Sequence, residues 1–273
     1  MKFMNLELAR RVEMAEAHAG ASCAEALASI RPDSPVAIER IAGGIAVFAG
    51  VGSPVSQAIG VGLDGAIAEA EFDRLEDFFW SRGAGVELEL CPLIDVSLYG
   101  EFAKRGYVLT EVSNVLVREI SPADAFEAPT AGITVRPAPP DEGKLWTDTV
   151  AQGFAEHFPV TPVLTDAMEG FFHRRGACCF YLAFVNDKVA GGGAVAAHER
   201  VCGLFGASTL PEFRRRGVQA ALLAARLRWA QEQGCDLAVS IARPASASQR
   251  NIERFGFGVA YTRTKLSREK SGG

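Results

Sequence analysis

Pro211-Glu212-Phe213-Arg214-Arg215-Arg216-Gly217-Val218-Gln219-Ala220-Ala221-Leu222 carries the most specific local chemistry in this chain. Its three arginines and one glycine lie between an apolar run, residues 201–210, and a helical pattern that begins near Gly217. The first N–H groups of a helix have no partner within it, and the helix dipole makes that end positive. Arginine adds forked donors that match phosphate oxygens. The stretch therefore predicts a strand, a loop and a helix whose N-terminus binds an anion such as pyrophosphate.

The helix after this loop is well specified. Its apolar residues recur at the spacing of one helix face, at Val218, Ala221, Leu222, Ala225 and Trp229. Gly234 is placed to end it, because glycine enters the left-handed region at little cost. The alternative interpretation is a solvated run of charges at a helix start, where three cations would oppose the dipole.

Two motifs in this order resemble the GNAT acyltransferase superfamily. Residues 214–219 resemble its R-x-x-G-x-G/A acetyl-CoA signature, with Pro211-Glu212-Phe213 as the usual lead-in. The match departs at Gln219, whose side chain must point away from the phosphates while its backbone N–H stays available. Residues 248–257 resemble the later helix of the superfamily, which closes with Gly256-Phe257 before a final strand. The resemblance covers residues 133–268, about half of the chain.

The resemblance implies an α/β (α+β) fold and an acetyl-CoA-dependent N-acetyltransferase. In that reaction an amine of a small molecule or peptide attacks the thioester directly, and the enzyme supplies proximity and oriented donors. The strand before the loop would pair with the pantetheine arm, and backbone N–H groups from Arg215 to Ala220 would meet the pyrophosphate. The residues that the resemblance assigns to acetyl-CoA (CoA) are Ser208, Thr209, Leu210, Arg214, Arg215, Arg216, Gly217, Val218, Gln219, Ala220 and Asn251.

The catalytic residues are less clearly marked. Many relatives place a general-acid tyrosine five residues before the closing phenylalanine, and here that position is Ile252. Tyr261 on the last expected strand is a candidate acid, although strand tyrosines most often serve packing. Glu156 and His157, in the expected substrate-side loop, are candidates for the base, directly or through water.

Composition agrees with a soluble protein that has sizeable cores, since 48% of the residues are apolar and 22% are charged. The net charge of −5 argues against a general nucleic-acid binder. No run of apolar residues is long enough to span a membrane, and the first residues do not form a secretory signal. The six cysteines and four histidines show no metal-ligand spacing. We therefore expect a cytoplasmic protein without a metal.

The length of 273 residues favours two domains, at roughly 150 residues each. A proline-rich segment supports this division: residues 1–125 form the first domain, 126–132 the linker and 133–273 the second. Each half contains a glycine, a strand, a helix, a second glycine and a strand, beginning at Gly83 and at Gly234. The alternative is that any two α/β segments look alike at this level. We expect a divergent duplication, with tandem GNAT-like domains that each contain a mixed, mostly antiparallel sheet flanked by helices.

The first half lacks the anion-binding chemistry. Where the second half has its arginines, the first has Gly60-Val61-Gly62-Leu63-Asp64-Gly65, without arginine and with a carboxylate that would repel pyrophosphate. We therefore expect a degenerate domain without a cofactor loop. Its role is left open between shaping the acceptor pocket and forming a homodimer contact.

Two other functions are alternatives to an acetyltransferase. A non-catalytic, CoA-binding regulatory module is consistent with Ile252 at the tyrosine position and with the degenerate first half. A nucleoside-triphosphate enzyme is disfavoured, because the loop lacks the G-x-x-x-x-G-K-[ST] spacing.

Overall fold

The computed structural model describes residues 4–127, 132–155, 159–174 and 176–270. The elements of the first half are α1 (Leu6–Ile30), β1 (Val36–Ile41), β2 (Gly44–Ala49), β3 (Gln57–Ile59), α2 (Glu69–Trp80), β4 (Val86–Leu90), α3 (Ser97–Lys104) and β5 (Val108–Glu119). Those of the second half are β6 (Ile133–Pro137), η1 (Pro140–Glu142), α4 (Gly143–Phe154), α5 (Pro162–His173), β7 (Cys178–Val185), β8 (Lys188–His198), β9 (Val201–Thr209), η2 (Pro211–Phe213), α6 (Val218–Glu232), β10 (Leu237–Ala242), α7 (Ala247–Glu253) and β11 (Gly258–Arg268).

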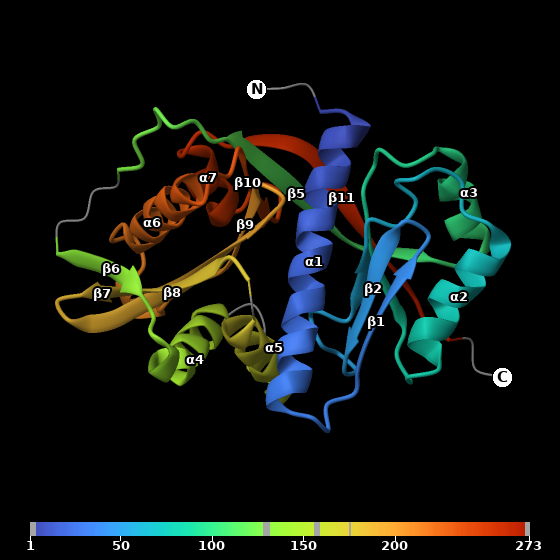
Figure 1. The fold of residues 1–273 in the computed structure, drawn as a ribbon, viewed down its shortest axis with the longest axis horizontal. Helices are drawn as coiled ribbons and strands as arrows, with labels where there is room; N and C mark the ends of the chain where they lie inside the picture. Colours follow the sequence, from blue (N-terminus) through green and yellow to red (C-terminus); the bar gives the residue numbers. More distant parts are fainter. Residues whose placement is uncertain (1–3, 128–131, 156–158, 175, 271–273) are drawn as a thin grey trace.

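The strands of these described residues form one continuous sheet, in the order β1-β2-β3-β4-β11-β5-β10-β9-β8-β7-β6 (Figure 1). Neighbouring strands are antiparallel except for two parallel pairs, β3 with β4 and β9 with β10. The sequence β2-β3-β4 therefore matches β8-β9-β10, each an antiparallel pair followed by a parallel pair. This arrangement confirms the expected fold class, two mixed and mostly antiparallel units flanked by helices.

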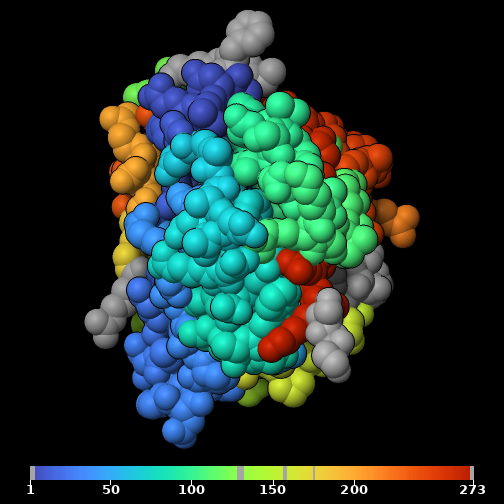
Figure 2. Space-filling model, turned by 90° about the vertical axis from the view of Figure 1, so that its right-hand side faces the viewer, coloured from blue at the N-terminus to red at the C-terminus, as the bar shows by residue number. Residues whose placement is uncertain are grey.

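The two halves exchange their last strands. β5 of the first half lies between β10 and β11, and β11 of the second half lies between β5 and β4. Val115 of β5 is paired with Ile241 on one side and with Tyr261 on the other. The end of β11 reaches the surface beside the helices of the first half (Figure 2). The sheet thus runs without a break from the strands of the first half to those of the second.

The side chains of β5 point alternately to the two faces of the sheet, so the exchanged strand packs in a core on each face. Val115 and Val117 pack in the core that includes α1 and the first-half strands, whereas Leu116 packs in the core under α6. Because successive residues of a strand point to opposite faces, one strand contributes to two cores. All three side chains are buried.

Helix α1 crosses the sheet at the junction of the two halves (Figure 1). It begins at an N-cap in which the Asn5 side chain accepts the N–H of Leu8 at 2.8 Å. It packs on β2 and β3 of the first half and on β9 and α5 of the second. One helix therefore holds both halves of the duplication together on this face.

The first two strands, β1 and β2, form a hairpin. Its turn residues, Ala42 and Gly43, both have positive φ, at 49° and 82°. Two positive φ angles are what a tight turn between antiparallel strands requires, and an alanine there gives little sign of it in the sequence. Within the described residues no helix combines the length and apolar character needed to cross a membrane.

We expect the exchanged strands to make the two halves unfold together. Leu88 is fully buried in the first-half core, so Leu88→Ala should lower the free energy of unfolding by about 2–5 kcal/mol. In a Trp80→Phe, Trp229→Phe background, Trp146 alone reports on the second half, and its urea midpoint should fall together with the circular dichroism midpoint. The half-exposed Leu145 beside it provides the control, since Leu145→Ala should change stability by less than about 1 kcal/mol. Two separate transitions, with the Trp146 midpoint unchanged in Leu88→Ala, would contradict this expectation.

Candidate functional site

Strands β9 and β10 separate in the middle of the sheet. They pair from Val201 and Leu237 as far as Leu204 and Ser240. Beyond that point β9 continues along β8 only, while β10 continues along β5. The far half of β9 therefore has an edge without a strand partner among the described residues.

A bulge lies on β9 just past this split. The pairing with β8 shifts between Gly192 and Ala194, which leaves two residues of β9, Gly206 and Ala207, opposite one. Gly206 has a φ of +54°, and a Cβ on it would lie 3.3 Å from the Trp146 ring. Only glycine satisfies both the backbone angle and the close approach at this position.

The loop after β9 presents a row of free backbone donors. Arg215 and Gly217 have positive φ, at 60° and 93°, and Ala221 makes the first helical bond, to the Gly217 carbonyl. The backbone N–H groups of residues 215–220 have no hydrogen-bond acceptor in the described part of the chain. These are the N–H groups that the sequence assigned to an anion.

The three arginines differ in their surroundings. Arg214 folds back, with its guanidinium donating to the carbonyls of Thr209 and Gly153 at 3.3 Å each. Arg215 is exposed beside the free N–H groups. Arg216 is also exposed and lies 5.7 Å from the centre of the Phe213 ring. Arg214 therefore braces the loop, while the other two side chains face solvent.

The side chain of Gln219 turns away from the loop. Its amide nitrogen donates to the Thr209 hydroxyl at 2.8 Å. The departure from glycine or alanine at this position therefore leaves the backbone N–H groups accessible. It also ties the start of α6 to the end of β9.

The remaining residues assigned to acetyl-CoA lie around the split. Ser208 is buried, with its hydroxyl donating to the Thr149 carbonyl at 3.5 Å. Leu210 donates its N–H to Ala190 at 2.9 Å, so this donor is already used. Asn251 lies on α7, which follows β10, and its side-chain oxygen accepts from Arg254 at 3.4 Å.

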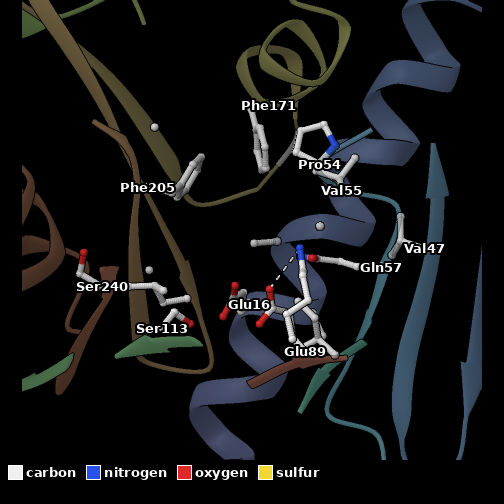
Figure 3. A pocket seen from close by; sticks show the side chains of 18 of the residues that line it. Glu16, Val47, Pro54, Val55, Gln57, Glu89, Ser113, Phe171, Phe205 and Ser240 are labelled. Atoms are coloured by element: carbon white, nitrogen blue, oxygen red, sulfur yellow. Dashed lines mark ion pairs between the residues drawn. The ribbon is translucent and has the colours of Figure 1, made fainter. Parts of the chain in front are cut away.

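A cleft of about 670 Å³ opens from the split toward the first half (Figure 3). Its second-half wall comes from β9, β10 and α5, and its first-half wall comes from α1, β2 and the segment around Pro54. Strands β4, β5 and β11 contribute polar side chains. The first half thus supplies a large part of a cavity that begins at the free edge of β9.

Ion pairs join α1, β4 and β11 at this cleft. The Arg263 guanidinium contacts Glu16 at 2.6 Å, Glu89 at 3.0 Å and Glu13 at 3.3 Å. Lys265 contacts Glu89 at 3.5 Å. The Arg263 side chain is only 2% exposed, and its three carboxylates hold its pKa well above the usual range despite burial. Sequence patterns do not indicate this cluster, because its members come together only through the strand exchange.

Two of these carboxyl groups have raised pKa values. Burial raises the pKa of Glu13 to about 7, with Arg263 acting in the opposite direction. Burial also raises the pKa of Glu89, which lines the cleft, against the influence of Arg263 and Lys265. Carboxyl groups with raised pKa values in a cavity are candidates for proton transfer near neutral pH.

Tyr261 is buried, and its hydroxyl donates to the Glu13 carboxylate at 2.5 Å. Burial raises the pKa of this hydroxyl, and the nearby Glu13 raises it further. The described residues that line the cleft include Arg263 and Lys265 from the same strand, but not Tyr261. The other two candidates, Glu156 and His157, lie outside the described residues. Ile252 is buried beneath α6.

The corresponding loop of the first half is occupied by an internal ion pair. Asp64 contacts the Arg10 guanidinium at 3.2 Å, and Arg10 also donates to the Leu63 carbonyl. The following helix, α2, begins with Glu69 and Glu71 in its first turn. Carboxylates at a helix N-terminus satisfy its positive end and exclude another anion.

Comparisons with known proteins agree with this architecture. A model of the acetyltransferase (GNAT) family matches residues 145–257. A GCN5-related N-acetyltransferase from Kribbella flavida superposes with a TM-score of 0.66 at 17% identity, over 94% of this chain and 96% of that one. A tandem GNAT protein from the clavulanic acid biosynthesis pathway gives 0.59 at 14% identity, over the same shares. A conserved Staphylococcus epidermidis protein of unknown function gives 0.60 at 10% identity, over 89% and 96%. A search of curated proteins gives no match.

We expect Glu13 to make stability depend on pH. Because its folded pKa of about 7 exceeds its ordinary value of 4.5, the folded state binds the proton more tightly than the unfolded chain. The stabilisation is complete below about pH 4.5 and is lost as the pH rises through 7. Glu13→Gln keeps a neutral side chain throughout, so the urea midpoint of the native protein should fall relative to this variant between pH 5 and pH 8. A difference that stays constant, or that changes in the opposite direction, would contradict the assignment.

Proposed function

We propose that the protein is an acetyl-CoA-dependent N-acetyltransferase acting on an amine, and the match of the acetyltransferase (GNAT) family model to residues 145–257 supports this proposal. The observation that carries this proposal is the row of free N–H groups of residues 215–220, next to the split between β9 and β10. A cleft leads from that split into the first half, so cofactor and acceptor would enter one continuous space.

The loop fits a pyrophosphate by its own chemistry. Six backbone N–H groups without a partner among the described residues lie at the positive end of the fifteen-residue helix α6, and Gln219 leaves them accessible. Arg215 and Arg216 would add charge from the solvent side. Ser208 and Thr209 lie on the free edge of β9, where a pantetheine arm would be held as an added strand, and Asn251 would contribute from α7. Bound acetyl-CoA would supply the thioester whose acetyl carbon the neutral amine attacks, forming a C–N bond as the C–S bond breaks.

Glu89 is the carboxylate best suited to take a proton from the amine. Its side chain is 13% exposed and lines the cleft, and its pKa is raised by burial. Glu16 is held more tightly, by two nitrogens of Arg263 at 2.6 and 3.0 Å, whereas Glu89 contacts Arg263 at 3.0 Å and Lys265 at the longer distance of 3.5 Å. Tyr261, the acid candidate from the sequence, is engaged with Glu13, and its hydroxyl would have to leave that carboxylate to act.

A second candidate is a CoA-binding module without catalysis. The buried Ile252 at the usual tyrosine position and the engaged Tyr261 favour it. Release of free thiol from acetyl-CoA across a set of amines separates the two functions. Tight CoA binding with no thiol release on any amine would support the module.

We expect the anion site to depend on Gly217. A carboxylate in Gly217→Asp would lie among the donors and repel a diphosphate, so the Kd for CoA should rise by about 100-fold in isothermal titration. Gly234→Asp is the matched control, because Gly234 has a φ of +70° at the other end of α6 and its Cβ would face open space. Equal affinity in the two variants would reject the pyrophosphate assignment.

Glu89→Gln should keep the shape of the cleft and remove the proton acceptor. We expect kcat/KM for acetyl transfer to fall by about 100-fold, with the Kd for CoA unchanged. Glu87→Gln lies two residues away on the same face of β4, outside the described cleft lining, and should retain activity. Full activity in Glu89→Gln would mean that another group accepts the proton of the amine.

A further inference from the structure

One part of the first-half wall of the cleft is a stripe along α1. Val12, Ala15, Glu16, Ala19 and Gly20 all line the cavity, at helical offsets of 0, 3, 4, 7 and 8 residues. All except Glu16 are small or apolar. A Cβ added to Gly20 would meet no atom within 4 Å, so this part of the wall borders open space. The small residues of α1 therefore leave room for a ligand between the halves.

The other walls are mostly apolar as well. Val47 and Val55 face the cleft from the first half, and Phe171 and Phe205 face it from the second (Figure 3). The two phenylalanine rings lie 5.0 Å apart and form a continuous aromatic surface. Burying this surface against an apolar ligand lowers the free energy. The surface offers no hydrogen-bond partner to a ligand's hydroxyl groups.

Charged and hydrogen-bonding side chains gather on another side of the same cavity. Glu16 and Glu89 lie close together below the rings, with Ser113 and Ser240 toward the split of the sheet (Figure 3). Arg263 and Lys265 also line this side and pair with the two glutamates, and Glu111 adds a third carboxyl group to the lining. A ligand that uses both regions must have one cationic or polar end and one apolar body. Its polar end would lie on the side where the free edge of β9 begins.

We propose that this interdomain cleft is an acceptor pocket selective for a primary amine with a single apolar body, such as an arylalkylamine. The amine lies near Glu16 and Glu89, and the body lies against α1, Phe171 and Phe205. The inference rests on the proposed acetyltransferase function and names its substrate class. A polyamine or an amino sugar would bring further polar groups against the apolar walls and leave them without partners.

The test uses the whole 273-residue chain and compares primary amines whose carbon skeletons differ in polarity. Thiol release from acetyl-CoA should give a kcat/KM for 2-phenylethylamine or tryptamine at least about tenfold above that for spermidine or glucosamine. A preference for spermidine or glucosamine would overturn the inference while leaving the acetyltransferase function intact. Failure to bind CoA, or no thiol release with any amine, would overturn the proposed function and the inference with it.

Gly20→Phe tests the location of the pocket. The new ring enters the open space on the α1 wall, so kcat/KM for 2-phenylethylamine should fall at least about tenfold, while the value for ethylamine changes by less than about threefold. The Kd for CoA should stay the same, because the loop at residues 215–220 is untouched. Gly20→Ala should behave as the native protein.

Gly100→Phe is the matched control. Gly100 is also a helical glycine whose Cβ would face open space, but it lies on α3, outside the described lining of the cleft. This variant should resemble the native protein with every amine. An unchanged preference for 2-phenylethylamine in Gly20→Phe, or an equal loss in Gly100→Phe, would show that the apolar body lies elsewhere.

Discussion

The pairing of β5 with β11 is the constraint on which this molecule depends. Each strand leaves its own half and completes the sheet of the other, and the two strands pair with each other at the centre. Without that pairing β5 and β11 would each present an open edge, which proteins avoid. The exchange therefore makes one folding unit out of two similar units, and it fixes the position of the first half relative to the loop at residues 214–220.

The exchange also explains why so many charges are buried at the centre. Arg263 and Lys265 are carried by β11 into the first half, where they meet Glu16 of α1 and Glu89 of β4. Removing one member of such a cluster would leave its partners buried and unpaired, at a much higher cost than replacing the whole cluster by apolar groups. The cluster thus specifies how α1, β4 and β11 must meet, and it leaves Glu89 at a cavity with a raised pKa.

The fold class and most elements could be predicted from the sequence, because their signals are local. The periodicity after Gly217 predicted α6, and Gly234, which was expected to end it, follows this helix with a φ of +70°. The free donors at residues 215–220 lie where the loop chemistry indicated. The strand exchange and the cleft could not be predicted, since they depend on pairing between residues more than 140 positions apart, such as Thr262 with Asn114. For the same reason, nothing in the sequence distinguishes Glu89 from the other polar residue of β4, Glu87.

The duplication leaves the two halves with different electrostatics at equivalent places. In the second half a loop rich in arginine precedes a helix with free donors; in the first, Asp64 is paired with Arg10, and glutamates occupy the first turn of α2. A half that cannot accept an anion at its own loop is free to place its strands and its long helix against the other half. These elements form the apolar wall of the cleft, to which β2 contributes Val47 and α1 contributes Gly20. Helix α1 serves both features, because one part of its length lines the cleft and another part supplies Arg10 to Asp64.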